Sequence, residues 1–228
     1  MHFQPNIVIP QLINSFKRGD YNSVVDAVER SPALVNVDPV VTQLYGGALR
    51  KLGLVQKSTK AFEKGLKKFP QAADLMNGFG NLLLDAGDKS KALAWFQKAL
   101  RINPKSFDYK YNAVRALCAL ESYVEAESKG RELLSERPHH LPLIILLSTI
   151  ASESGDNFLA RRYLLDVLAI DNQNVTALNN LGNIFREDGA LDKAEDAYRK
   201  AINAGGTSAI LYQNLAAVQG LQGKTAAA

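Results

Sequence analysis

Asparagine recurs at regular intervals in this chain, and its side chain could recognise the backbone of another polypeptide. Asn112, Asn180 and Asn214 are separated by 68 and 34 residues. An asparagine amide donates and accepts hydrogen bonds at once, so it can match both the N–H and the C=O of an extended peptide. Each asparagine could instead bond to a neighbouring turn or to solvent. The set as a whole predicts a peptide-binding surface.

Tyr111 and Arg115 form a second candidate binding feature, because they are four residues apart and would lie one helical turn apart. Tyrosine and arginine are the residue types that anchor many protein interfaces. The alternative is an exposed tyrosine stacked on an arginine without a partner. Both interpretations stay open at this point.

Residues that could catalyse a reaction or hold a metal ion are scarce. Cys118 is the single cysteine, and His139 and His140 follow Pro138 with no Asp, Glu or Cys at ligand spacing. We expect the two histidines to be surface turn residues and the thiol to be structural. The sequence predicts no catalytic site, no metal site and no cofactor.

The composition excludes several further classes of protein. With 46% hydrophobic and 22% charged residues over 228 positions, the chain is typical of a globular protein. The longest apolar runs, such as Leu143–Leu147, fall far short of the roughly 20 residues of a membrane-spanning helix. The N-terminus does not resemble a secretory signal, so we expect a cytoplasmic protein with no membrane segment. The modest net charge of +4, without aromatic-interleaved basic motifs, argues against nucleic acid as a partner.

The elements that would position these residues repeat every 34 residues. A column of glycines marks this period at Gly19, Gly53, Gly87, Gly155, Gly189 and Gly223, with Glu121 in the one remaining place. Pro70, Pro104 and Pro138 keep the same step. The period divides a single domain, 1–228, into repeats 5–38, 39–72, 73–106, 107–140, 141–174 and 175–208, followed by a terminal helix 209–223.

Each repeat is predicted to form two helices. The glycine column closes the first helix, because glycine readily adopts a positive φ, and the proline column ends the second. Small residues at repeat positions 8 and 20, such as Gly80 and Ala92, would let the two helices pack closely. The fold class is therefore all-α.

Two repeats resemble tetratricopeptide repeats at nearly every signature column: repeat three reads LMNGFGNLLLDAGDKSKALAWFQKALRINP and repeat six reads LNNLGNIFREDGALDKAEDAYRKAI. The resemblance implies a right-handed superhelix, an α-solenoid of six helix pairs, whose first helices line a concave groove that binds proteins or peptides. The last two repeats are similar to the arrays of O-linked N-acetylglucosamine transferases, which also carry asparagine in the column of Asn112, Asn180 and Asn214.

The groove is therefore the expected binding surface, on the first helix of each repeat. The candidate residues are Asn77, Asn81, Tyr111, Asn112, Arg115, Thr149, Asn179, Asn180, Asn183 and Asn214. A basic stripe of Lys57, Lys60, Lys64, Lys67 and Lys68 on the second helix of repeat two is interpreted as a solvated convex face.

The resemblance also offers a sharper alternative, the carboxylate clamp of chaperone-binding repeats. Asn81 and Asn112 match two of its five columns, but Asn77, Pro142 and Leu146 occupy the three columns that should be filled by lysine or arginine. A carboxylate without cationic partners would be poorly held. We therefore do not expect binding of chaperone tails.

Two repeats depart from the pattern. Pro10 predicts a shortened first helix in repeat one. Repeat four has Lys110 at a normally apolar position, Glu121 for the turn glycine and Gly130 in the middle of a helix, where glycine is less favourable than alanine by about 1 kcal/mol. Repeat four is predicted to be the least stable.

The sequence favours a non-enzymatic scaffold that binds an extended polypeptide segment, with the oligomeric state open. An alternative is that the chain is the N-terminal recruiting module of a longer glycosyltransferase, sulfotransferase or hydroxylase, because GKTAAA ends the chain inside a seventh repeat.

Overall fold

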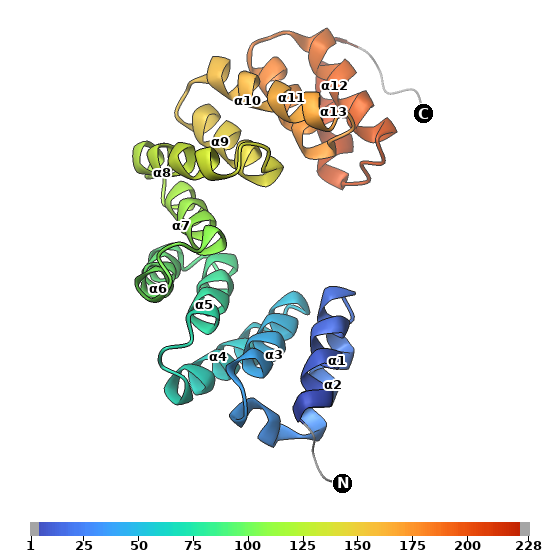
Figure 1. Cartoon of the computed structure of the whole chain (residues 1–228). Helices are drawn as coiled ribbons and strands as arrows, with labels where there is room; N and C mark the ends of the chain where they lie inside the picture. Colours follow the sequence, from blue (N-terminus) through green and yellow to red (C-terminus); the bar gives the residue numbers. More distant parts are fainter. Residues whose placement is uncertain (1–4, 224–228) are drawn as a thin grey trace. The chain divides into compact units, whose positions relative to one another are not determined.

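The computed structural model describes residues 5–223, and their side chains from residue 8 onward. Within this range the chain forms α-helices and one short 3-10 helix, with no strand (Figure 1). The elements are α1 (Pro5–Lys17), α2 (Tyr21–Arg30), η1 (Pro32–Asn36), α3 (Pro39–Lys51), α4 (Val55–Lys68), α5 (Ala73–Asp85), α6 (Lys89–Ile102), α7 (Phe107–Ala119), α8 (Tyr123–Glu136), α9 (Leu141–Glu153), α10 (Asn157–Ile170), α11 (Val175–Glu187), α12 (Leu191–Asn203) and α13 (Ala209–Leu221). The predicted all-α class is confirmed.

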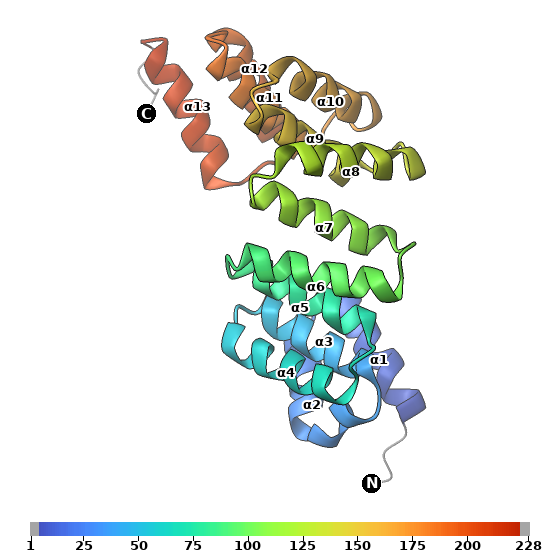
Figure 2. The same cartoon turned by 90° about the vertical axis from the view of Figure 1, so that its left-hand side faces the viewer.

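The chain divides into two compact units, Met1–Glu121 and Ser122–Ala228. The N-terminal unit holds α1 to α7 and the C-terminal unit holds α8 to α13. In each unit the two helices of a complete repeat pack against one another, and the first helices of neighbouring repeats also touch, as α3 and α5 do (Figure 2). The prediction of a single domain stays a prediction.

Successive first helices begin 34 residues apart, as the sequence period predicts. The first helices begin at Pro39, Ala73, Phe107, Leu141, Val175 and Ala209. The glycine column ends these helices in the left-handed region, for example Gly53 at φ 73° and Gly87 at φ 85°. Glu121 takes the same conformation at φ 61° and is the one non-glycine residue with positive φ in the described part of the chain.

The glycines at position 8 are required by aromatic rings of the second helix. A methyl group built on Gly80 would lie 2.6 Å from the Phe96 ring, and one on Gly182 would lie 2.5 Å from the Tyr198 ring. These separations are well below van der Waals contact. The predicted close packing of the two helices in a repeat is therefore confirmed.

The prediction of a shortened first helix in repeat one is wrong. Helix α1 has 13 residues and continues through Pro10. A proline inside a helix removes one backbone hydrogen bond and crowds the preceding turn, but Leu12 of α1 is buried in a core with Val24 and Leu49. Tertiary packing therefore outweighs the local preference.

Helix α2 ends one turn earlier than the corresponding helices of other repeats. It has 10 residues, whereas α4, α6, α8 and α10 have 14 each. The cause is Pro32, which stands where the other repeats have Leu66, Leu100, Leu134, Leu168 or Ile202. The chain continues as η1 instead, with Ser31 at φ −137°.

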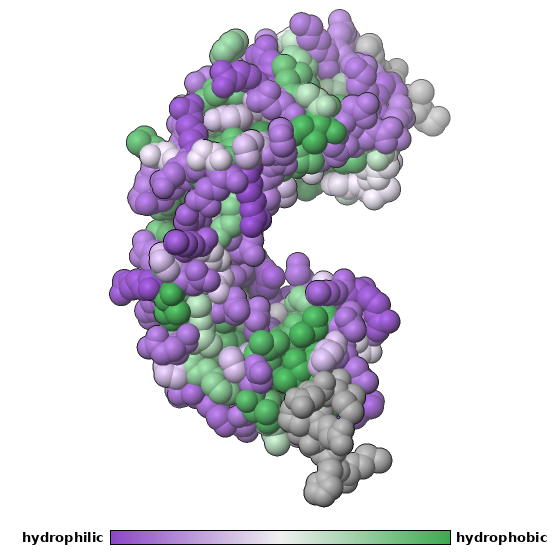
Figure 3. All heavy atoms as spheres, in the orientation of Figure 1, coloured by the Kyte–Doolittle hydropathy of each residue, from purple (hydrophilic) through white to green (hydrophobic). Residues whose placement is uncertain are grey.

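The surface of both units is largely hydrophilic on the side that Figure 3 shows, with smaller apolar areas between the polar ones. Large exposed apolar side chains include Val124 and Phe158, which are 87% and 77% exposed. Across residues 5–223, no helix is both long and apolar enough to cross a lipid bilayer.

Candidate functional site

Side-chain hydrogen bonds join the neighbouring first helices α5 and α7. The Asn112 Nδ2 donates to Asn77 Oδ1 at 2.8 Å. The Arg115 Nη1 donates to Asn81 Oδ1 and to Asn112 Oδ1, both at 3.1 Å. Four of the candidate groove residues therefore form one connected network, which we call the amide network.

The C-terminal unit repeats this arrangement between α11 and α13. The Asn214 Nδ2 donates to Asn179 Oδ1 and to Asn183 Oδ1, both at 3.2 Å. The hydroxyl of Tyr198 on α12 donates to the same Asn183 oxygen at 2.7 Å, and Asn179 Nδ2 donates to Asn180 Oδ1 at 3.4 Å. Asn214 thus bonds to the preceding repeat in the same way as Asn112.

These bonds show which polar atoms remain for a ligand. The amide oxygens of Asn77, Asn81 and Asn183 accept hydrogen bonds from within the chain. Within the described range, the amide nitrogens of these three residues and of Asn180 donate to no protein group. Peptide binding by the asparagines stays a prediction, and it would use their N–H groups rather than their oxygens.

A polar hollow of about 240 Å³ lies between α9 and α11 in the C-terminal unit. It brings together three candidate residues, Thr149, Asn180 and Asn183. The Thr149 hydroxyl donates to the Ile145 carbonyl at 3.2 Å, so its oxygen can still accept a bond. The other lining residues are Ser148, Ser152, Glu153, Leu164, Ile184 and Glu187.

The carboxylates of Glu153 and Glu187 make the polar hollow acidic, since its lining contains no basic residue among those described. These two glutamates are not among the ten candidate groove residues predicted from the sequence. A signal for them existed, because both occupy the thirteenth position of their repeats and end a first helix. The hollow therefore presents amide donors, hydroxyl acceptors and negative charge side by side.

Tyr111 and Arg115 lie on α7, as predicted, and both are partly buried. Burial raises the pKa of the Tyr111 phenol, and the charge of Arg115 opposes this shift in part. Because Asn81 and Asn112 hold the Arg115 guanidinium, its orientation is set before any partner binds.

Further contacts join neighbouring first helices through residues 35 positions apart. Arg50 on α3 forms an ion pair with Asp85 on α5, and the Tyr109 hydroxyl on α7 donates to Asp74 on α5. Burial, followed by the hydrogen bond to Asp74, raises the pKa of the Tyr109 phenol. Much of the polar surface of the first helices in the N-terminal unit is therefore committed to intramolecular contacts.

His139, His140 and Cys118 belong to no cluster of metal-binding side chains within the described residues. His140 caps α9, since its Nδ1 accepts a hydrogen bond from the Leu143 backbone N–H at 3.1 Å. Cys118 is partly buried on α7. Between residues 5 and 223 no group of three or more His, Cys, Asp or Glu side chains could hold a metal ion.

A family model named tetratricopeptide repeat matches residues 46–107 and 146–209. The chain belongs to the tetratricopeptide repeat family. The matched segments lie in separate units, so both units carry the repeat. The first segment begins inside α3 and the second inside α9.

This tetratricopeptide repeat chain is similar to parts of longer proteins. It is 25% identical over 183 residues to human protein O-mannosyl-transferase TMTC1, which covers 78% of the chain and 21% of the relative. It is 33% identical over 73 residues to a Caenorhabditis elegans UDP-N-acetylglucosamine–peptide N-acetylglucosaminyltransferase, covering 32% of the chain and 6% of that protein. The chain spans about a fifth of the length of the human relative.

Solved tetratricopeptide structures share the fold. One crystal structure, of a tetratricopeptide repeat protein from Parabacteroides merdae, superimposes with a TM-score of 0.78 over 96% of this chain and 87% of that one. The sequence identity is 16%, so the similarity supports the fold and not a specific partner.

Proposed function

We propose that the chain is a protein-interaction scaffold that binds an extended polypeptide segment along its first helices. The observation that carries the proposal is the polar hollow between α9 and α11, where Thr149, Asn180 and Asn183 meet beside two glutamates. Tetratricopeptide repeat proteins generally bind protein or peptide partners, and this supports the proposal. The chain itself is proposed to have no catalytic role.

The polar hollow suits a peptide backbone chemically. The amide nitrogens of Asn180 and Asn183 can donate to peptide carbonyls, and the Thr149 oxygen can accept from a peptide N–H. Packed helices lie about 8 to 10 Å apart, so about three extended residues would cover the step from α9 to α11. Glu153 and Glu187 favour a lysine or arginine on the bound segment.

A peptide selection tests this proposal. A random peptide library displayed on phage would be selected against the whole chain, and affinities of the selected peptides would be measured by calorimetry. We expect N180A and T149V to weaken binding by about tenfold each, because loss of one well-placed hydrogen bond costs about 1 kcal/mol or more. The matched control is N172A, an exposed asparagine outside the hollow.

The proposal would be overturned if the selected peptides bound N180A, T149V and N172A with the affinity of the wild-type chain. Selected peptides should also be enriched in lysine or arginine. Selection of acidic peptides that avoid the hollow would point to another surface.

A second candidate is supported by the names of the relatives. Two of them are glycosyltransferases of which this chain matches a small part. The chain would then be the substrate- or partner-recruiting module of a longer enzyme, a glycosyltransferase rather than a sulfotransferase or hydroxylase. Sequencing the transcript beyond Ala228 tests this, and a stop codon at that point would exclude it.

Two earlier expectations stay predictions. The chain is expected in the cytoplasm, and its partners are expected to be proteins rather than nucleic acid. Fractionation of cells that express a tagged full-length protein would test the first expectation.

A further inference from the structure

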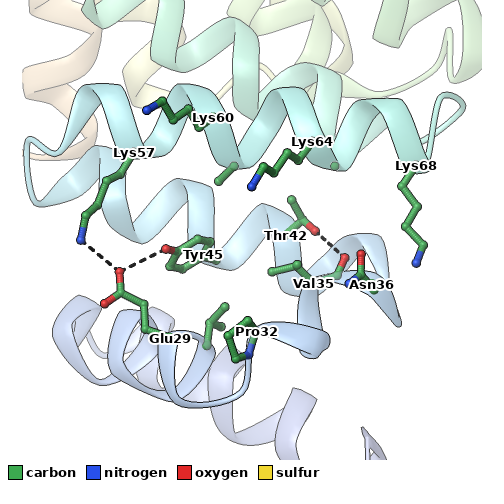
Figure 4. Close-up of a pocket in the computed structure, with 13 residues that line it drawn as sticks. Glu29, Pro32, Val35, Asn36, Thr42, Tyr45, Lys57, Lys60, Lys64 and Lys68 are labelled. Carbon is green, nitrogen blue, oxygen red and sulfur yellow. Dashed lines mark hydrogen bonds and ion pairs between the residues drawn. The ribbon is translucent and has the colours of Figure 1, made fainter.

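A second cavity, separate from the polar hollow, lies in the N-terminal unit between α4, α3, α2 and η1. It measures about 600 Å³ and we call it the lysine pocket. Its lining residues are Val28, Glu29, Pro32, Val35, Asn36, Thr42, Tyr45, Lys57, Lys60, Ala61, Lys64, Gly65 and Lys68. Figure 4 shows the lysines spread along α4 on one side, with Glu29 and Pro32 on the opposite side.

The pocket exists because α2 ends early. Pro32 replaces the leucine or isoleucine that other repeats place at this position, and one helical turn of α2 is absent. The Thr42 hydroxyl on α3 donates to the Val35 carbonyl at 3.1 Å and so ties η1 to the floor. The floor itself is apolar, since Val28 and Gly65 are buried there and Val35 and Ala61 are partly buried.

The charge of the pocket is strongly uneven. Glu29 is its single acidic residue, and its carboxylate already accepts hydrogen bonds from Lys57 Nζ and the Tyr45 hydroxyl, both at 3.2 Å. Lys60, Lys64 and Lys68 have no carboxylate within 4.0 Å anywhere in the described part of the chain. Three positive charges therefore face an apolar floor without counter-charges.

The spacing of these lysines matches an extended chain. Residues four apart on a helix rise by about 6 Å, so Lys60, Lys64 and Lys68 cover about 12 Å along α4. Alternate residues of an extended peptide lie about 6.6 Å apart and point to the same side. The intervening residues point to the other side.

We propose that the lysine pocket binds an extended peptide in which acidic and apolar residues alternate. The acidic side chains would pair with Lys60, Lys64 and Lys68 on α4, and the apolar side chains between them would cover Val28 on α2 and Val35 on η1. About five peptide residues fill the 12 Å row. This site lies in another unit than the polar hollow and takes peptides of opposite charge.

The chemistry of the pocket favours carboxylates over phosphate groups. Phosphate sites commonly use the planar fork of arginine or backbone N–H groups at a helix N-terminus. Of the residues described as lining the pocket, none is an arginine, and Lys60, Lys64 and Lys68 lie in the middle and C-terminal part of α4. The steps of about 6 Å between Lys60, Lys64 and Lys68 match single carboxylates on alternate residues of an extended peptide.

Fluorescence anisotropy with synthetic peptides tests this proposal on the whole chain. The probe is a labelled Glu-Leu-Glu-Leu-Glu peptide, and the comparison peptide is Glu-Glu-Glu-Leu-Leu, which has the same composition without alternation. We expect the alternating peptide to bind about tenfold more tightly. The triple variant K60Q/K64Q/K68Q should bind it at least about tenfold more weakly, because each exposed pair contributes up to about 1 kcal/mol.

The matched control is K67Q/K89Q/K98Q, which removes three exposed lysines outside the pocket and should bind within twofold of the wild-type chain. A second variant leaves the charge unchanged. P32L restores the apolar residue that other repeats have at this position and should fill the pocket, so that binding is lost while helicity by circular dichroism is retained.

Several results would overturn the proposal: no detectable binding at millimolar peptide, equal binding of the two peptides, or equal losses in the pocket and control variants. Tighter binding of single-stranded RNA, lost in K60Q/K64Q/K68Q, would replace the peptide by nucleic acid. None of these results bears on N180A and T149V, so the proposed function is tested separately.

Discussion

The side-chain nitrogen of Asn112 lies 2.8 Å from the side-chain oxygen of Asn77 on the neighbouring first helix. The two residues are 35 positions apart, one more than the repeat length, and Asn214 and Asn179 form the same pair in the other unit at 3.2 Å. A 34-residue period places equivalent residues of adjacent first helices side by side. The recurring asparagines therefore link one repeat to the next.

Loss of this link should destabilise the N-terminal unit. N112A removes the donor to Asn77 and one acceptor for Arg115, and Asn112 is only 8% exposed. We expect a loss of about 1 to 3 kcal/mol in the free energy of unfolding, because its partners are partly buried. Urea denaturation measures it. N172A, in an exposed turn, is the control and should change stability by less than about 0.5 kcal/mol.

Close packing within a repeat predicts a strong effect of one added methyl group. G80A would place a carbon 2.6 Å from the Phe96 ring, so we expect a destabilisation of about 1 to 3 kcal/mol. G220A is the matched control, since nothing lies within 4 Å of its methyl group, and should instead stabilise the chain by at most about 1 kcal/mol. Equal effects of the two changes in thermal unfolding would contradict the packing explanation.

The positive φ of Glu121 predicts a stabilising substitution. A non-glycine residue in the left-handed region is less favourable by about 1 to 2 kcal/mol, and glycine is not. We expect E121G to raise the free energy of unfolding by about 1 kcal/mol. This value allows for the greater conformational entropy of glycine in the unfolded chain. The reverse change G87A, at φ 85° with open space around it, should lower stability by a similar amount. A destabilising E121G would show that the glutamate side chain has a compensating role.

Repeat four should open more readily than its neighbours. The backbone strain at Glu121 and the buried Gly130 in the middle of α8 both lie in residues 107–140. Hydrogen exchange followed by mass spectrometry should show lower protection there than in repeats three and six. Equal or greater protection in repeat four would refute the prediction.

The buried tyrosines predict a loss of stability at alkaline pH. The folded-state pKa of Tyr109 is raised by burial and by Asp74. The protonated phenol therefore stabilises the fold fully below the unfolded-state pKa of about 10, and this stabilisation is lost as the pH rises above that value. The midpoint temperature of thermal unfolding should therefore decrease as the pH is raised above about 10, and Y109F should make the decrease smaller. A control, Y212F, removes an exposed tyrosine and should leave the pH profile unchanged.

Much of the fold could be predicted from the sequence, because its signals are local. Each glycine of the column ends a first helix through a backbone preference that depends on one residue, and the 34-residue period follows from counting. The packing role of Gly80 and Gly182 could also be predicted from the sequence, since the two helices of one repeat meet at fixed sequence positions. These features belong to one repeat and need no knowledge of the next.

Only the tertiary structure shows which polar side chains hydrogen-bond to one another. Whether Asn77 and Asn112 face a ligand or each other depends on a separation of a few ångströms between two helices, which a repeat period does not specify. Pro10 was misjudged for the same reason, because Leu12 of α1 is buried in a core with Val24 and Leu49 and this packing holds α1 together. Pro32 stood in the sequence as an exception at an apolar position, yet the pocket beside Lys60 and Lys64 appears only when η1, α3 and α4 are assembled, since a cavity is a property of the space between elements.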